Sequence, residues 1–418
     1  MKRHVMHRAT LAAIAALVLA SAARADRFTV EVPAGDTERV HTPVRFSLHV
    51  SAEHAERTAV VLAAADGTEL LGQLTGPGLL VEPAEAPAGF VARELHCVIP
   101  RLAAGESLTV DLDFAAPVPE APSFAWEDTP QDNALLSFDD RPVLRYMYAP
   151  LDTSSPQVRE ETYKVFHHLY NPAGTRPLTK GPGGLFSHHR GLFYGFNRIT
   201  DAQGRSADTW HCSGDAHQSH QEFLAEEAGP VLGRHTVVVG WHGHGGEMFA
   251  REQRQMTVYH TSGGHLVEFA SRLESLGGTI RLDGDPQHAG FQFRAAQEVA
   301  DGDPDANTYF LRPDGRGAPG RTRNWSEPGD AFADLPWNAM SFVVDGDRYT
   351  VVYLDHPDNP KEARYSERTY GRFGSYFEYD LTEKEPLELN YRVWLQAGEM
   401  TVDEAARRHH DFVSPPGA

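Results

Sequence analysis

The stretch Ser341–Leu354, SFVVDGDRYTVVYL, decides the fold class of this 418-residue chain. Two runs rich in β-branched and aromatic residues flank the turn-forming segment Asp345-Gly346-Asp347. Side chains of these types favour strands, and Asp-Gly suits the tight turn that joins two antiparallel strands. The stretch therefore predicts a β-hairpin and, with it, an antiparallel sheet.

Further strand-like segments lie on both sides of this hairpin, whereas helical periodicity is scarce. The best helix candidate is 402–412, and a second, short helix is predicted at 157–168. Strands are expected at 143–148, 236–239, 256–259 and 387–395. Residues 131–418 should therefore form a large antiparallel β-sandwich of the supersandwich, mutarotase-like type, in which twisted sheets pack face to face.

A smaller β domain is predicted before this one, at residues 26–114. Its segments 27–32, 44–50 and 108–114 alternate apolar and polar residues with period two. Short strands separated by Gly, Pro and Asp turns favour a small sandwich of the immunoglobulin-like type. Residues 115–130 contain four prolines and little periodicity, which predicts a linker.

The first 25 residues have the pattern of a secretory signal peptide. A basic start precedes an apolar run at 10–20 and the small-residue sequence Ala23-Arg24-Ala25, which fits a cleavage site. No later run approaches the ~18 apolar residues that a membrane span needs. We therefore expect an exported protein, periplasmic or extracellular, with no membrane span.

The charge balance argues against nucleic acid as a partner. The whole chain has a formal net charge of −20. Without the four basic residues of the signal peptide, 34 basic residues stand against 58 acidic ones, a net charge of −24. A chain this acidic repels phosphate backbones, so nucleic-acid binding is not expected.

Two cysteines, Cys97 and Cys212, are the only thiols in the sequence. They are far apart and fall in different predicted domains, although an oxidising compartment allows a disulfide between them. Two residues are too few for a disulfide-rich scaffold or for a cysteine zinc site.

The segment 184–196, GLFSHHRGLFYGF, sets three potential cations among aromatic residues. An unpaired buried charge is costly, so a solvent-reachable cleft is one explanation for them. If the segment is a strand, His188 and Arg190 share one face and His189 lies on the other. Arg offers a planar donor fork that suits an anion or a sugar acid. The alternative is that Arg190 pairs with a carboxylate and the histidines bond to backbone groups.

Histidines are dense in the middle of the chain, where 12 of the 22 lie between His167 and His265. On a strand, the pair His242-Gly-His244 would place both rings on one face, which is a metal-chelating geometry. The neighbouring glycines indicate a turn instead, and no third ligand is evident. Hydrogen-bonded loop histidines are therefore the competing interpretation.

Two further segments place polar residues where a turn meets a strand. In the first, 283–294, a strand would bring His288, Gln292 and Arg294 to one face. The second begins with Asp355 and His356 and follows the predicted hairpin. Such loop positions often carry function, although Asp, Asn and Pro also serve as ordinary turn formers.

Four tryptophans lie near these polar clusters in the sequence, and their faces suit the C–H surfaces of sugars. Packing in the core is the alternative for each of them. The four are Trp210, Trp241, Trp325 and Trp337.

Several motifs taken in order resemble an uncharacterised exported bacterial family. They are Ser-His-His-Arg-Gly at 187–191, Asp208-x-Trp210, the run 288–294 and Asp-His-Pro-x-Asn-Pro at 355–360. The family is called PmoA-like, or methane oxygenase-like, and the resemblance covers roughly residues 130–400. It implies an exported β-sandwich similar to mutarotases and polysaccharide lyases. Methane oxidation itself is rejected, because the subunit that gave the name is an integral membrane protein.

The leading hypothesis is an exported carbohydrate-active protein that uses histidine acid/base chemistry on a sugar or glycan, in a mutarotase-, lyase- or hydrolase-like reaction. His188 and His288 are assigned to proton transfer and Arg190 to charge stabilisation, with Glu252 as a spare general base. Whether the protein is an enzyme is left open. The residues assigned to substrate binding are His189, Asp208, Trp210, His211, His220, Arg294, Asp355 and His356.

Two alternatives remain beside this hypothesis. One is a non-catalytic glycan-binding or cell-surface protein. The other is a histidine-bound copper or zinc protein built from His211, His242 and His244 or their neighbours. The leading hypothesis assigns no metal and no cofactor, and the oligomeric state is left open.

Overall fold

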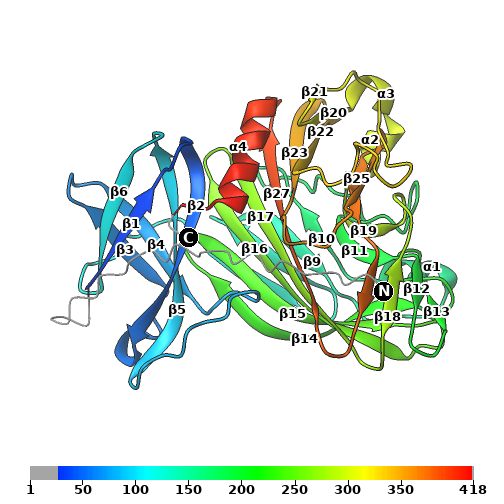
Figure 1. Cartoon of the computed structure of the whole chain (residues 1–418), viewed down its shortest axis with the longest axis horizontal. Helices are drawn as coiled ribbons and strands as arrows, with labels where there is room; N and C mark the ends of the chain where they lie inside the picture. Colours follow the sequence, from blue (N-terminus) through cyan, green and yellow to red (C-terminus); the bar gives the residue numbers. More distant parts are fainter. Residues whose placement is uncertain (1–26, 417–418) are drawn as a thin grey trace, which may run out of the picture.

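A computed structural model of the chain describes residues 27–416, so the predicted signal peptide at 1–25 lies outside the described residues. The strands fall into two groups that lie side by side (Figure 1). Every strand pair in the four sheets is antiparallel, which confirms the predicted all-β class. Within residues 27–416, no helix has the length and apolar character needed to cross a membrane.

The first group is one six-stranded sheet in the order β1-β6-β3-β4-β5-β2. Its strands are β1 (Arg27–Pro33), β2 (Arg39–Ser51), β3 (Ala59–Ala64), β4 (Glu69–Thr75), β5 (Phe90–Leu102) and β6 (Ser107–Asp113), with a 3-10 turn, η1 (Ala52–His54), after β2. Apolar side chains from all six strands meet in one core, so the sheet curls over itself. The layers expected of an immunoglobulin-like sandwich therefore belong to a single hydrogen-bonded sheet.

The second group is a sandwich of two large sheets. The eight-stranded sheet contains, in spatial order, β24 (Arg364–Arg368), β25 (Arg372–Tyr376), β19 (Ala289–Arg294), β11 (Leu192–Phe196), β10 (Phe166–Leu169), β9 (Arg141–Met147), β8 (Asn133–Phe138) and β7 (Phe124–Thr129). The nine-stranded sheet contains β14 (His217–Ala228), β15 (Leu232–His242), β16 (Met248–Thr261), β17 (Gly264–Ser275), β27 (Leu387–Ala397), β23 (Asp347–Asp355), β22 (Trp337–Val344), β20 (Tyr309–Arg312) and β21 (Gly315–Arg316). Apolar residues of both sheets share one core, as expected for face-to-face packing.

The hairpin that predicted this fold is β22 and β23. Val344 pairs with Asp347 across the turn, and both central residues, Asp345 and Gly346, have positive φ angles of 54° and 81°. Two positive φ values are the requirement of the hairpin turn that Asp-Gly favours. The local sequence thus fixes both the turn and the register of the two strands.

A small four-stranded sheet and four short helices complete the second group. The sheet contains β13 (Ser206–Ala207), β12 (Arg198–Thr200), β18 (Ile280–Asp283) and β26 (Tyr379–Leu381), and the helices are α1 (Pro156–Thr162), α2 (Gln297–Asp301), α3 (Pro304–Asn307) and α4 (Val402–Val413). Helix α4 confirms the predicted C-terminal helix and starts with a capping box between Thr401 and Glu404. The helix predicted at 157–168 is wrong beyond residue 162, because its last residues join the sheet as β10.

The predicted linker at 115–130 is also partly wrong. Its residues 124–129 form β7, whose Phe124 pairs with Phe138 of β8. The prolines of this stretch lie on either side of β7, so they leave its backbone N–H groups free to pair. The proline content predicted irregular structure throughout residues 115–130, whereas a short strand forms between the prolines.

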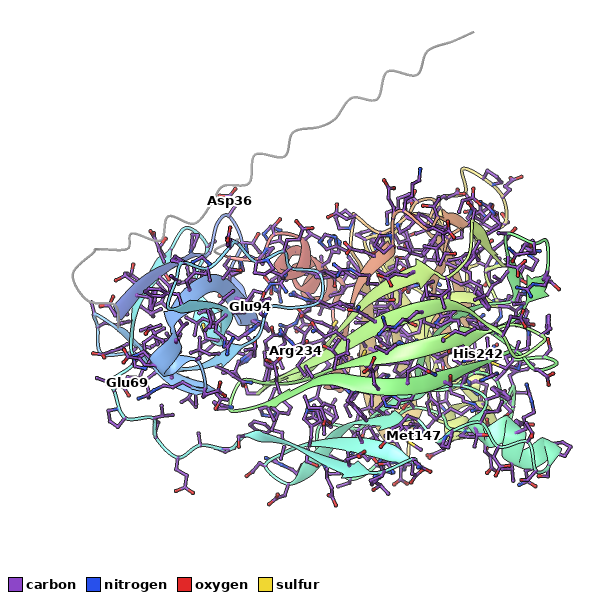
Figure 2. The ribbon with its side chains drawn as sticks, turned by 90° about the horizontal axis from the view of Figure 1, so that it is seen from below. Asp36, Glu69, Glu94, Met147, Arg234 and His242 are labelled. Atoms are coloured by element: carbon purple, nitrogen blue, oxygen red, sulfur yellow. The ribbon has the colours of Figure 1, made fainter. Side chains whose placement is uncertain are left out.

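Buried polar side chains tie the two groups of strands together. Gln73 of β4 accepts hydrogen bonds from the backbone N–H groups of Val231 and Leu232 at 3.0 and 2.9 Å. Arg234 of β15 donates to Thr75 Oγ1 at 3.2 Å and lies 3.5 Å from the carboxylate of Glu94. Figure 2 shows Glu94 and Arg234 where the six-stranded sheet meets the long strands of the sandwich.

The two cysteines are free thiols and both are buried. Cys97 belongs to the core of the six-stranded sheet, and burial raises the pKa of its thiol to about 12. The disulfide that the sequence allowed between Cys97 and Cys212 is therefore not formed.

Candidate metal centre

The segment before β11 is a loop, which corrects the strand reading of its histidines. The backbone turns at Phe186, where φ is +52°, and the N–H of His189 donates to the carbonyl of Phe186 at 2.9 Å. Regular strand structure begins only at Leu192. Face alternation therefore does not govern where His188 and Arg190 point.

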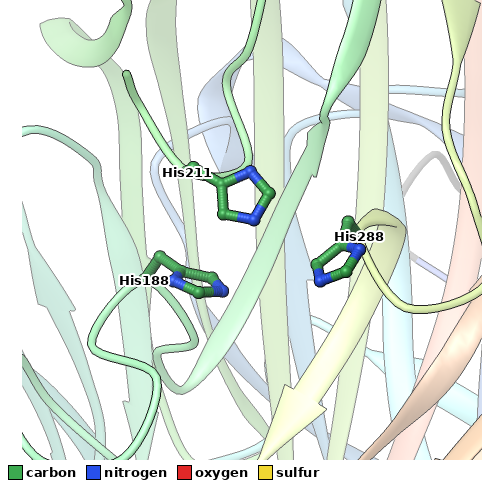
Figure 3. A group of neighbouring side chains, drawn as sticks. All are labelled: His188, His211 and His288. Carbon is green, nitrogen blue, oxygen red and sulfur yellow. The ribbon is translucent and has the colours of Figure 1, made fainter. Parts of the chain in front are cut away.

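Three histidines from three separate loops converge at one point. One ligand nitrogen from each of His188, His211 and His288 lies within 4.8 Å of the others. Figure 3 shows the three rings turned toward a common centre. About a third of each of the His211 and His288 side chains is exposed, at 34% and 31%, so the centre is reachable from solvent.

His211 is oriented by a carboxylate three residues before it. Asp208 accepts hydrogen bonds from the backbone N–H groups of Trp210 and His211 through Oδ1, at 3.0 and 2.8 Å. Its other oxygen lies 2.9 Å from Nδ1 of His211. A carboxylate only accepts, so Nδ1 carries the proton and Nε2 keeps a free lone pair.

His288 has the same arrangement with Asp285. Its Nδ1 lies 2.9 and 3.1 Å from the two carboxylate oxygens, and the N–H of Gln287 and the amide of Asn197 also bond to this carboxylate. Burial alone would raise the pKa of Asp285, but the bonds from His288 and Gln287 outweigh it and lower the pKa to about 2. Asp285 is therefore ionised at neutral pH and holds the His288 ring in one tautomer.

His188 differs, because no carboxylate of the described residues bonds to its ring. Its Nε2 is buried and makes no hydrogen bond. Burial and the nearby Lys164 and His211 lower the pKa of His188 to about 2, so the ring is neutral at neutral pH. A neutral imidazole with a free lone pair is the form that binds a metal ion.

Long-range contacts hold the three loops in place. Strand β11 pairs with β19 from Leu192↔Phe293 to Phe196↔Ala289. His188 precedes the start of β11 and His288 precedes the start of β19, at opposite ends of this pair, so the His188 loop must fold back along it. Lys164 then joins two of the loops, because its ammonium group donates to the carbonyls of both His188 and Trp210.

Several of the predicted binding residues do lie around the three histidines. Asp208 and His211 belong to the centre itself, and His189 contacts Trp210 with ring centroids 5.4 Å apart. Trp210 also lies 6.2 Å from His288 between ring centroids, but it has no exposed surface. Its indole therefore packs beneath the centre and is not a stacking platform for a sugar.

Two of the residues assigned to catalysis, Arg190 and Glu252, form structural contacts away from the three histidines. Arg190 donates to the backbone carbonyls of Ser187 and Glu161 at 3.0 and 3.2 Å, and its guanidinium lies over the ring of Tyr163. It is fully buried, so it holds the loop and helix α1 together. The predicted role of Arg190 in charge stabilisation at the site is therefore withdrawn.

Glu252 lies in the core of the sandwich. It has no exposed surface, and its carboxylate accepts from the guanidinium of Arg254, the indole of Trp241 and the hydroxyl of Ser271 at 2.8–2.9 Å. Both oxygens are occupied by these bonds, so the carboxylate is not available as a spare general base.

His220, Asp355 and His356 form other contacts. The ring of His220 packs against Tyr146, Tyr148 and Phe223. Asp355 pairs with Lys361 at 3.2 Å, and burial raises the pKa of its carboxyl group. His356 packs against Phe412 of α4. None of these partners contacts the three histidines within the described part of the chain.

The metal site suggested for His211, His242 and His244 is also not formed as a set. His242 bonds to Ser219 through Nε2 at 2.9 Å, and its ring stacks on His217. His244 bonds to the carbonyl of Ser213. The sequence did contain a signal for the observed set, namely the spacing Asp-x-x-His, which occurs at 208–211 and again at 285–288.

The geometry suits a divalent transition metal ion. Three neutral imidazoles are a known ligand set for a metal ion that keeps a coordination position open. Carboxylates behind two of the rings fix their orientation and raise their basicity, as in many metal sites. Imidazole ligands suit zinc, copper, iron and nickel rather than calcium or magnesium.

Comparison with known proteins places the second group of strands in a family but gives no activity. No curated protein matches the chain. Among solved structures, it is similar to a protein in the glycosyl hydrolase family 38 from Enterococcus faecalis, with a TM-score of 0.42 and 7% identity over 89% of this chain. The chain spans 44% of that structure, and so low a similarity says nothing about function.

The model of a family of unknown function, DUF6807, matches residues 134–410. This range contains all three histidines and agrees with the region, roughly 130–400, over which an uncharacterised family was predicted. The methane oxygenase-like label of that family stays a prediction. The chain therefore belongs to the DUF6807 family, whose function is unknown.

Proposed function

We propose that this protein is an exported metalloenzyme, in which His188, His211 and His288 bind a divalent transition metal ion such as zinc. The observation that carries this proposal is the convergence of three imidazole nitrogens within 4.8 Å of one another. Two of these rings already have their carboxylate partners, and the third has a buried nitrogen without a hydrogen bond. An ion at the centre would satisfy that nitrogen.

The open coordination position supports catalysis rather than a purely structural role. Structural zinc sites use four protein ligands, whereas catalytic sites keep one position for water or substrate. The exposure of His211 and His288 gives that position access to solvent. Such an ion lowers the pKa of bound water and polarises a substrate oxygen.

A sugar or glycan is the substrate that we propose for this centre. The support is the expected export of the chain and the aromatic side chains beside the histidines, of which Phe186 is 43% exposed. In this proposal His188 and His288 act as metal ligands, in place of the proton-transfer roles expected from sequence. A hydrolase- or lyase-like reaction is compatible with a Lewis-acid centre.

A second candidate is metal-free acid/base catalysis, which the two His–Asp pairs favour. A carboxylate bonded to Nδ1 orients an imidazole and stabilises its protonated form, so His211 and His288 could exchange protons through Nε2. Both pairs have the 2.9 Å separation that this requires.

Metal content separates the two candidates. We expect the purified protein, after treatment with a chelator, to bind one equivalent of Zn²⁺, measured by calorimetry and by elemental analysis. His211→Ala should weaken binding at least 100-fold, whereas His244→Ala, a loop histidine outside the centre, should leave it unchanged. Equal binding by the two variants, or no stoichiometric zinc, would rule out the proposed centre.

Turnover then tests the enzyme assignment. The chelated and zinc-loaded proteins are compared on a panel of glycosides and oligosaccharides. Zinc-dependent turnover supports the metalloenzyme, and turnover that survives chelation but is lost in Asp208→Asn supports acid/base catalysis. Binding of glycans without turnover in either form would point to a non-catalytic glycan-binding protein.

A further inference from the structure

The buried cations of this protein divide into two classes by their partners. Of the seven buried arginines among residues 27–416, four form ion pairs with a carboxylate, namely Arg39, Arg234, Arg254 and Arg312. The other three and both buried lysines form none among residues 27–416, and these five are Lys164, Lys180, Arg190, Arg294 and Arg372. Buried charges are normally paired, so five exceptions need an explanation.

All five of these residues lie close to the loop that carries His188 and His189. Lys164 bonds to the carbonyl of His188, and Lys180 lies 3.5 Å from the carbonyl of His189. The backbone of Arg294 bonds to Gly191 at 2.8 Å and to Lys180 at 3.1 Å. Burial lowers the pKa of Lys164 to about 8 and that of Lys180 to about 7, so the three buried arginines carry the permanent positive charge of this region.

Arg294 and Arg372 are two buried like charges on neighbouring strands. They are directly opposite each other on β19 and β25, so their side chains leave the same face of the sheet. Neither has any exposed surface. Like charges at opposed positions destabilise a sheet, and burial strengthens the repulsion.

Their donors are incompletely used. Arg294 donates through Nη1 to the carbonyls of Ala295 and Tyr370, while Nε and Nη2 have no partner among residues 27–416. Arg372 donates to Gln292 and Ser366 at 3.0 Å, while Nε has none. His189 is 2% exposed, and neither of its ring nitrogens has a partner in the part of the chain that the structure describes.

We propose that Arg294, Arg372 and His189 form the binding site for an oxyanion group of the substrate, next to the three-histidine centre. A carboxylate, sulfate or phosphate accepts several N–H groups at once and matches the planar guanidinium fork. The substrate class is therefore an acidic sugar, such as a uronate or a sugar sulfate. This inference rests on the proposed function for its meaning, because it names the substrate of that centre.

The rings of Tyr370 and Phe186 both lie beside His189, with centroids 6.3 and 5.5 Å from its ring. Tyr370, which is half-buried, lies 5.1 Å from the Arg294 guanidinium, and the ring of Phe186 lies 5.1 Å from that of Tyr370. Phe186 lies in the turn before β11; its side chain is 43% exposed, and its backbone carbonyl accepts from the N–H of His189. In this proposal the oxyanion enters past these two rings, which belong to turns rather than to strands.

The first test measures binding with the full mature protein after chelation, so that its outcome is independent of the metal. Glucuronate, galactose 6-sulfate and inorganic phosphate are compared with glucose by calorimetry. We expect at least one oxyanion-bearing compound to bind ten-fold or more tightly than glucose, and the arms distinguish carboxylate, sulfate and phosphate. Equal or absent binding of all four would overturn the oxyanion site even if zinc binds as proposed.

The second test uses the stability of the free protein. Arg294→Met removes an uncompensated charge, so its urea midpoint should equal or exceed that of the parent, while oxyanion binding falls 10- to 100-fold. Arg312→Met is the matched control, because it strands Glu367 and should lower the midpoint while oxyanion binding persists. A midpoint loss in Arg294→Met as large as in the control, or unchanged oxyanion binding, would overturn the proposal. Arg372→Gln gives the same comparison if Arg294→Met does not fold.

Discussion

The Nδ1 atom of His211 lies 2.9 Å from a carboxylate oxygen of Asp208, three residues earlier in the chain. The same relation holds between His288 and Asp285 at the same spacing and the same distance. Each carboxylate binds the turn backbone as well as the ring, so it fixes the loop and the tautomer together. Two independent loops thus present the same nitrogen, Nε2, to one centre.

Removing the charge of Asp208 should weaken metal binding without unfolding the protein. In Asp208→Asn, an amide oxygen can still accept from the two backbone N–H groups, but the ring loses its anionic partner. Loss of such a partner costs about 10- to 100-fold in metal affinity. Competition against a chelator of known zinc affinity measures the change.

The exposed Asp36 provides the control for this experiment, because Asp36→Asn changes the net charge equally and lies in the six-stranded group. Its zinc affinity should match that of the parent. Identical affinities for Asp208→Asn and Asp36→Asn would show that the carboxylate does not support a metal ligand.

Glu252→Gln should destabilise the protein and leave zinc binding intact. The substitution strands the guanidinium of Arg254, which is buried and has no other carboxylate partner in the described part of the chain. Breaking a buried ion pair by neutralising one partner costs about 3–5 kcal/mol. Urea unfolding measures the free energy, and calorimetry measures zinc binding. A stable variant that has lost zinc binding or activity would restore Glu252 as a site residue.

Gly191→Ala should be strongly destabilising. Gly191 has a φ angle of +49°, and an added Cβ would lie 2.1 Å from the carbonyl oxygen of His167. Backbone strain and this clash together should cost about 3 kcal/mol or more. Gly277→Ala is the control, since a Cβ there meets open space, and its midpoint should shift little. Comparable losses in both variants would contradict the packing of the loop against β10.

His96, at the contact between the two strand groups, should contribute to a fall in stability between pH 6.5 and 4. Burial, with Arg234 nearby, lowers the pKa of His96 to about 4 from its ordinary 6.5, although Glu94 opposes the shift. The unfolded chain therefore takes up a proton first as the pH falls, which lowers the free energy of unfolding by up to about 3 kcal/mol across this window.

The variant His96→Gln tests this pH dependence. It removes the titrating ring, so the free energy of unfolding should decline less steeply between pH 7 and 4 than in the parent. Glu94 titrates lower: its pKa of about 2 confines its own contribution to pH values below about 4.5. A variant whose decline is as steep as that of the parent would show that other groups control this window.

The sequence by itself determined the elements whose structure is local. The Asp345-Gly346 turn, the strands on both sides of it and helix α4 follow from backbone preference and from the period of apolar residues. Errors arose where local preference and the sheet disagreed. The helix predicted at 157–168 ends at Thr162, because the last residues of that range pair with β9 as β10. The strand β7 lies between prolines in the range predicted as a linker.

Only the tertiary structure decided which polar residues share a site. His188, His211 and His288 are separated by 23 and 77 positions and meet through the pairing of β11 with β19 and the folding of loops over that pair. The pairing of β19 with β25 places Arg294 opposite Arg372, while Glu252 and Trp210 are buried inside the protein. Side-chain chemistry can be read from sequence, but convergence depends on long-range strand register, which no local pattern encodes.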